Sequence, residues 1–128
     1  MPIRCIVVTP ERTELDREAD FVALPMFDGE LGVQNGRAPM IGRLGHGVLR
    51  LQTNAGPERY FVDGGFAQVE SDTVNILTSR AISVDLLDGD DAAKTLSDAL
   101  EMPSETPEET EIKDAAVRRA RGMLRASR

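Results

Sequence analysis

Cysteine and histidine often serve as nucleophiles, general bases and metal ligands, and this chain has one of each. Cys5 lies in the β-rich run Ile3–Val8, so we expect it to be a small buried hydrophobe. His46 lies between Gly45 and Gly47, which is typical of a turn or a strand edge. One histidine and one cysteine are too few for a structural zinc site built from these ligands. The two residues therefore predict neither a nucleophile with its base nor a metal site.

The carboxylates are numerous, but they gather where helices are expected to begin. The acid-rich runs 88–91 and 105–111 fit the positive N-terminal ends of helices better than a cleft with paired general acids and bases. The chain has no Gly-x-x-x-x-Gly-Lys phosphate loop, and its Gly64-Gly65 pair precedes a strand-like segment rather than a helix. These patterns indicate a structural or interaction protein with no catalytic residue.

The overall charge excludes some classes of partner. With 15 Lys plus Arg and 22 Asp plus Glu, the 128 residues carry a net charge of −7, which disfavours nucleic-acid binding. No apolar run approaches the roughly 18 residues that cross a bilayer. The first residues lack the basic and apolar segments of a secretory signal, and the single cysteine fits a reducing compartment. We therefore expect a cytosolic protein.

The charge also divides the chain into parts. Residues 1–84 hold 11 acids and 8 bases, and residues 85–114 hold 11 acids and 2 bases. Residues 115–128 hold five arginines and no acid. Such sharp changes indicate a chain built in pieces, and we place the boundary between residues 84 and 85.

The first part reads as antiparallel β-structure. Short β-rich or alternating segments are separated by glycine, proline, serine and asparagine turn signals, as in a sandwich or a barrel. The Gly64-Gly65 pair is expected to break one of these segments in two. The expected strands are 3–8, 21–24, 48–52, 59–63, 66–70 and 74–77.

The second part reads as an antiparallel helical hairpin over roughly 88–126. The first helix begins at the acidic run 88–91 and ends at Met102-Pro103, and the second begins at Thr106-Pro107 with Thr106 as its cap. The hairpin has few large apolar side chains, so it requires support from the sandwich or from a partner. The expected apolar stripes are Ala93, Leu96 and Leu100 on the first helix, and Ile112, Ala116, Ala120 and Met123 on the second.

Four ordered motifs resemble one family. Residues 28–39 read DGELGVQNGRAP and resemble the signature DGELGVLPGHAP of the ε subunit of F-type ATP synthases. Residues 8–12 resemble that family's first strand end, and residues 47–51 resemble its Gly-x-Leu-x-Leu strand. Residues 62–69 resemble its V-x-GGF-x-EV hairpin, and the likeness continues through the tail.

The resemblance implies a fold and a role. The fold is an N-terminal antiparallel β-sandwich of two five-stranded sheets over 1–84, followed by a C-terminal α-helical hairpin over 85–128. The role is that of a non-catalytic rotor subunit of the proton-translocating complex, bound to the γ subunit and the c-ring. Such a subunit lies peripherally at the cytoplasmic face of the bacterial inner membrane. In many members the tail extends toward the α and β subunits and suppresses ATP hydrolysis.

The resemblance also implies contacts made by the sandwich. Glu30 is expected to form an ionic contact with a basic loop of the c-ring; alternatively, Gly29 and Gly32 only shape a turn and Glu30 is solvated. The γ subunit is expected to contact Arg37, Ala38 and Pro39. Arg37 replaces a histidine of the family pattern, so we expect a matching acidic residue on this organism's γ subunit.

Contacts of the tail follow in the same way. Four arginines resemble the basic face that meets an acidic segment of the β subunit; alternatively, they only neutralise the acidic half of the tail and the helix C-terminus. In some members ATP binds to the hairpin, and Asp88 and Arg119 match two of the contacts. Asp91 stands where those members have an arginine, so we expect ATP binding in the millimolar range or none, and no other cofactor. The four arginines are Arg118, Arg119, Arg121 and Arg125.

Three hypotheses follow from these patterns. The first is a rotor subunit with an inhibitory tail. The second is the same subunit with a tail that is a passive brace or an assembly aid. The third is a stand-alone ligand-binding sandwich protein, either a sensor or a small enzyme.

Overall fold

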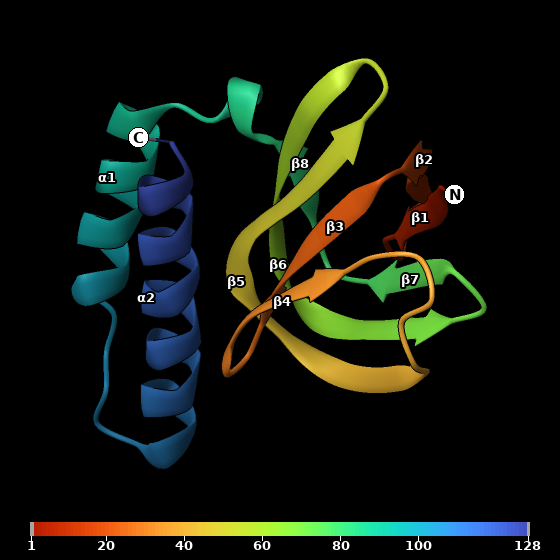
Figure 1. Cartoon of the computed structure of the whole chain (residues 1–128). Helices are drawn as coiled ribbons and strands as arrows, with labels where there is room; N and C mark the ends of the chain where they lie inside the picture. Colours follow the sequence, from red (N-terminus) through yellow and green to blue (C-terminus); the bar gives the residue numbers. More distant parts are fainter. Residues whose placement is uncertain (1, 128) are drawn as a thin grey trace.

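Strands come first along the chain and two helices follow (Figure 1). The structure is a computed structural model, and it describes residues 2–127. The strands are β1 (Ile3–Val8), β2 (Thr13–Ala19), β3 (Phe21–Met26), β4 (Gly29–Val33), β5 (Met40–Thr53), β6 (Gly56–Glu70), β7 (Thr73–Leu77) and β8 (Ala81–Ser83). A short 3₁₀ turn, η1 (Val84–Leu86), leads to α1 (Gly89–Leu100) and α2 (Pro107–Ala126). This confirms the predicted class of a β-sandwich followed by two helices.

The prediction of two five-stranded antiparallel sheets was wrong in its details. The strands form one eight-stranded sheet in the order β2-β1-β7-β6-β5-β3-β4, and β8 pairs with β6. The β1–β7 pair is parallel, whereas the other pairs are antiparallel. The sheet is continuous because β5 and β6, with 14 and 15 residues, run through both layers of the sandwich.

Gly64 and Gly65 bend β6 instead of ending it. Their φ angles are +71° and +104°, a region that L side chains rarely adopt. A Cβ on Gly65 would collide with the carbonyl oxygen of Leu77 on the neighbouring β7. The expected segments 59–63 and 66–70 are therefore halves of one strand, and the bend folds the sheet over its own core.

The core lies between the two layers of the folded sheet. Three of the strands were not expected from the sequence: β2 is a mostly exposed and charged edge strand, β4 contains two glycines, and β8 has three residues. The fully buried large side chains include Ile3, Val22, Leu24, Val33, Leu49, Leu51, Phe61, Val69 and Ile76.

Cys5 is fully buried in this core, as expected. Burial raises the pKa of the Cys5 thiol to about 12, so the reactive thiolate is scarce at neutral pH.

We predict that iodoacetamide at about pH 8 leaves Cys5 unmodified in the folded chain. The same reagent is expected to alkylate it completely in guanidinium chloride, because unfolding exposes the thiol and restores its ordinary pKa. Intact mass spectrometry at successive times measures both reactions. Equal alkylation rates in the two conditions would contradict the burial.

Both helices begin as the sequence indicates. The Asp88 carboxylate accepts hydrogen bonds from the backbone N–H groups of Asp90 and Asp91, at 2.8 and 3.4 Å. The Thr106 hydroxyl oxygen accepts one from the N–H of Glu109 at 3.1 Å. These side chains satisfy donors that a helix N-terminus otherwise leaves without partners.

The buried helix faces differ from the expected stripes. On α1 the buried residues are Ala92 and Ala99, whereas the expected Ala93 and Leu100 are exposed. On α2 the expected Ile112 is 59% exposed. The fully buried residues of α2 are the expected Ala120 together with Gly122 and Ala126, and their small size allows α1 and the sheet to approach the helix closely.

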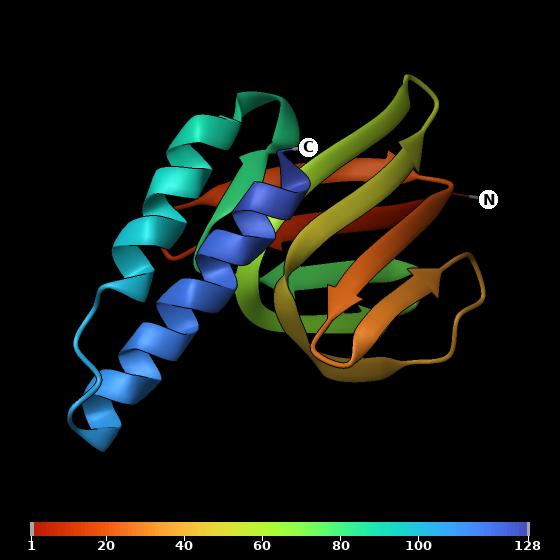
Figure 2. The ribbon, with the colours of Figure 1, turned by 90° about the vertical axis from the view of Figure 1, so that its left-hand side faces the viewer.

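The helix α2 lies between α1 and the sandwich, beside β5 and β6 (Figure 1). Viewed from the helical side, the two helices run side by side as a hairpin (Figure 2). We call this packed arrangement the docked tail.

Candidate functional site: a buried carboxylate between the sandwich and the tail

Asp63 lies at the bend of β6, immediately before Gly64. Its backbone N–H donates to Thr78 Oγ1 and to the Arg80 carbonyl oxygen, both at 3.1 Å. Its side chain is only 2% exposed. The bend and these bonds hold the carboxylate under α2, where an ionised group requires compensation.

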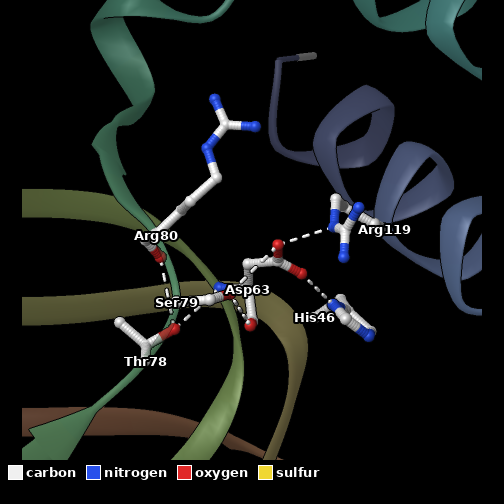
Figure 3. Close-up of polar contacts among 6 residues, drawn as sticks. All are labelled: His46, Asp63, Thr78, Ser79, Arg80 and Arg119. Carbon is white, nitrogen blue, oxygen red and sulfur yellow. Dashed lines mark hydrogen bonds and ion pairs between the residues drawn. The ribbon is translucent and has the colours of Figure 1, made fainter. Parts of the chain in front are cut away.

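Three side chains from three segments meet this carboxylate (Figure 3). His46 on β5 donates from Nδ1 to Asp63 Oδ1 at 2.6 Å. Ser79 donates to Asp63 Oδ2 at 3.3 Å. Arg119 on α2 places its Nε 2.6 Å from Oδ2. We call His46, Asp63, Ser79 and Arg119 the Asp63 cluster.

Arg119 supplies the positive charge that the buried Asp63 requires. The Arg119 side chain is 41% exposed, so its outer part remains in contact with water. The Nε–H is not directed at the oxygen, so the contact is an ion pair without a well-aligned hydrogen bond. Removing one partner of such a pair leaves a buried charge uncompensated, which is costly. The docked tail and the burial of Asp63 therefore depend on each other.

Gly122 brings α2 close enough for this contact. It lies three residues after Arg119 and is buried against β5. A Cβ at this position would lie 2.9 Å from the His46 carbonyl oxygen and 3.1 Å from Phe61 Cε2. Any side chain here would push the helix away from the sheet.

The Asp63 cluster does not have the arrangement of a hydrolytic site. A serine nucleophile is activated when its hydroxyl is bonded to the base, as in Ser–His–Asp triads. Here Ser79 donates to Asp63 and to the Asp63 carbonyl oxygen, and His46 makes a separate bond to the same carboxylate. The cluster joins parts of the chain and activates no hydroxyl group.

The residues predicted to contact the c-ring and γ lie near one another. Glu30 on β4 forms an ion pair with Arg50 at 2.6 Å, and both side chains are about half exposed. Arg37, Ala38 and Pro39 are exposed in the connection between β4 and β5. Glu30 and Arg37 both line one shallow pocket of about 590 Å³. The roles predicted for these residues stay predictions.

The four tail arginines divide into two groups. Arg118, Arg121 and Arg125 line a cleft of about 720 Å³ between α2 and the sandwich, as their spacing indicates. Arg119 contacts Asp63 instead. Their predicted contact with the β subunit stays a prediction.

The two residues predicted to bind a nucleotide have other contacts here. Asp88 caps α1, and Arg119 pairs with Asp63. Within residues 2–127 there is no group of three or more metal-ligating side chains. In the same range, no helix is long and apolar enough to cross a membrane.

Comparisons with known proteins place this geometry in context. Residues 2–84 match the family model described as the β-sandwich domain of the ATP synthase delta/epsilon chain. An ATP synthase epsilon chain from Rhodopirellula baltica is 83% identical over 128 residues, which is 100% of both chains. The chain belongs to the ATP synthase epsilon-chain family. It is thus a non-catalytic subunit of that complex.

Two further similar chains are more distant. The epsilon chain of Granulibacter bethesdensis is 38% identical, over 95% of this chain and 94% of that one. A chain in a structure of the Euglena gracilis mitochondrial ATP synthase, containing OSCP, F1 and the c-ring, is 22% identical with a TM-score of 0.87. The alignment covers 99% of this chain and 82% of the Euglena chain. At this identity the likeness supports the fold and nothing further.

The sequence did not identify the Asp63 cluster. The sequence predicts a turn or a strand edge at His46, and contacts of Arg119 with the β subunit or with a nucleotide. In fact His46 lies within β5, where it is in register with Asp63 on β6. Asp63 is the residue that could have revealed the cluster. It follows Phe61 and Val62 in an apolar strand, and a buried acid requires a partner.

Proposed function

We propose that this epsilon chain is a central-stalk rotor subunit of the proton-translocating F-type ATP synthase. In this proposal its sandwich joins the γ subunit to the c-ring, and its tail inhibits ATP hydrolysis when it leaves the sandwich and reaches the α and β subunits. The subunit would then lie at the cytoplasmic face of the bacterial inner membrane, held there by the complex. The family membership supports the stalk assignment, and it counts against the stand-alone sandwich protein.

The Asp63–Arg119 ion pair is the observation that carries the regulatory part. It connects the domain that matches the family model to the tail beyond residue 84. The fully buried residues of α2 are all small: Ala120, Gly122 and Ala126. Because small residues bury little apolar area, the docked tail has limited stability and can be released. Release would free Arg119 to join Arg118, Arg121 and Arg125 in contacts with acidic residues of the β subunit.

The sandwich offers surface for the γ subunit and the c-ring. Phe66 and Leu77 are directly paired on β6 and β7, and both are more than half exposed. Ile41, which is 73% exposed, lies on β5 beside the shallow pocket of Glu30 and Arg37. Exposed apolar side chains next to charged ones are typical of protein interfaces. Contact of Glu30 with the c-ring would require it to exchange its present partner, Arg50.

The second candidate is the same rotor subunit with a passive tail. The internal pairing of Arg119 favours it, because this arginine already has a carboxylate partner in the docked tail. In either case we expect ATP to bind the subunit weakly or not at all, since Asp91 places an acid where a phosphate-facing cation would be required.

Measurement of ATP hydrolysis separates the two candidates. The catalytic complex is reconstituted with the full chain, with residues 1–84 alone, and with neither. We expect suppression of turnover only with the full chain, because only it carries the inhibitory helices. Binding of both forms to the γ subunit serves as the control. Unchanged turnover despite binding would establish the passive tail, and failure of both forms to bind γ would contradict the stalk assignment.

A further inference from the structure

A basic cleft lies between α2 and the sandwich, next to the Asp63 cluster. Its volume is about 720 Å³. One wall is formed by Arg118, Arg121 and Arg125 of α2, and the opposite wall includes Arg43 and His46 of β5. Among residues 2–127, Glu111 supplies the one carboxylate that lines the cleft.

The four arginines of this cleft are not neutralised within the described chain. Arg4, Arg12, Arg17, Arg50 and Arg119 each have a carboxylate within 4.0 Å. Across residues 2–127, the cleft arginines form no such ion pair. Arg43 lies over the Phe27 ring at 4.7 Å, a contact that leaves its N–H groups available. Docking of the tail therefore brings like charges from two elements toward each other.

The sandwich side of the cleft leaves room between these charges. Gly29, Gly45, Gly64 and Gly65 line it and place no side chain in the space. A ligand can thus approach Arg43 and the arginines of α2 at the same time.

We propose that the basic cleft binds a multivalent phosphate anion that bridges α2 and β5 and so stabilises the docked tail. The planar guanidinium group presents a fork of N–H donors that matches phosphate oxygens. An anion with two phosphoryl groups can contact both walls and offset the repulsion between them. The residues lining the cleft include none from α1, so the site is separate from Asp88. The proposal does not depend on inhibition by the tail.

Calorimetric titration of the full chain with pyrophosphate tests the binding. We expect saturable binding that weakens about tenfold in Arg43→Gln and in Arg121→Gln, since each variant removes one charged contact. Arg59→Gln is the matched control, because Arg59 is exposed on β6 and does not line the cleft. Absence of binding to the wild-type chain, or equal affinity in Arg43→Gln, would overturn the proposal.

Two further measurements test which anion the cleft prefers and whether the bound anion bridges α2 and β5. Sulfate, which carries a single anionic group, is expected to bind at least tenfold more weakly than pyrophosphate. ATP is expected to bind no better than pyrophosphate, and a clear preference for ATP would assign the site to nucleotides instead. Pyrophosphate is expected to slow amide hydrogen exchange in α2 of the wild-type chain but not of Arg43→Gln. Binding without this slowing would overturn the bridging role.

Discussion

Replacing Arg119 with glutamine is expected to release the tail while the sandwich stays folded. Asp63 is 2% exposed and would lose its positively charged partner, while His46 and Ser79 would remain. Water can reach a charged Asp63 only if α2 moves away. Removing one partner of a buried ion pair costs about 3–5 kcal/mol, and the exposed outer part of Arg119 favours the lower end. The docked tail has little else to offset this loss.

Amide hydrogen exchange along α2 measures the release. We expect exchange to accelerate about tenfold or more in Arg119→Gln, whereas amides of β1 and β7 keep their wild-type rates. Lys113→Gln is the matched control, because Lys113 lies on the same helix, forms no ion pair within residues 2–127 and does not line the basic cleft. If Arg119→Gln exchanges like the wild type, the ion pair does not hold the tail.

Gly122→Ala is expected to release the tail from the sandwich by an independent mechanism. Alanine favours a helix by about 0.5–1 kcal/mol over glycine, so α2 itself becomes more stable. Its Cβ nevertheless meets the His46 carbonyl oxygen and Phe61, so docking becomes less favourable. Faster exchange at the docking face with unchanged helicity would separate loss of docking from loss of the helix.

Replacing Gly65 with alanine is expected to have the largest effect on folding. A non-glycine residue in a rarely allowed conformation costs about 1–3 kcal/mol, and overpacking against a neighbour costs about 1–3 kcal/mol more. Gly65 would incur both costs, because its φ is +104° and its Cβ would collide with the Leu77 carbonyl oxygen. We therefore expect a loss of about 2–6 kcal/mol in the free energy of unfolding.

Gly56→Ala is the control for this change. Gly56 has a φ of +115°, but its added Cβ would meet nothing within 4 Å. Denaturant unfolding of both variants separates the two costs, since Gly56→Ala carries only the backbone strain. Equal losses in the two variants would show that the β6–β7 contact at the bend is not tight.

The sequence predicted the strands and helices better than the way in which they pack together. Turn residues and helix caps act over a few positions, so the sandwich, the hairpin, the acidic start of the first helix and the cap residue Thr106 could be found. Whether Gly64-Gly65 ends a strand or bends it depends on β5 and β7, which lie beside it in space. The apolar stripes predicted for the helices differ in part from the buried residues for a related reason. Alanine and glycine contribute little to a hydrophobic pattern, and yet they are the residues buried where the helices pack.

The site was predicted only in part for the same reason. The spacing of Arg118, Arg121 and Arg125 places them on one helix face, and they line one cleft. The role of Arg119 depends on Asp63, a residue from a distant strand, and nothing local to either residue reveals the pair.

The parallel pairing of β1 with β7 determines when the sandwich can close during synthesis. β1 is the first strand made, and it has both of its neighbours, β2 and β7, only after residue 77 has been added. Until then the growing chain carries an apolar β1 that has only β2 to cover it, so β1–β2 must wait for the later strands. The tail is made last, when the surface that it docks on already exists. Synthesis therefore delivers Arg119 only after the strands that carry His46 and Asp63 have been made.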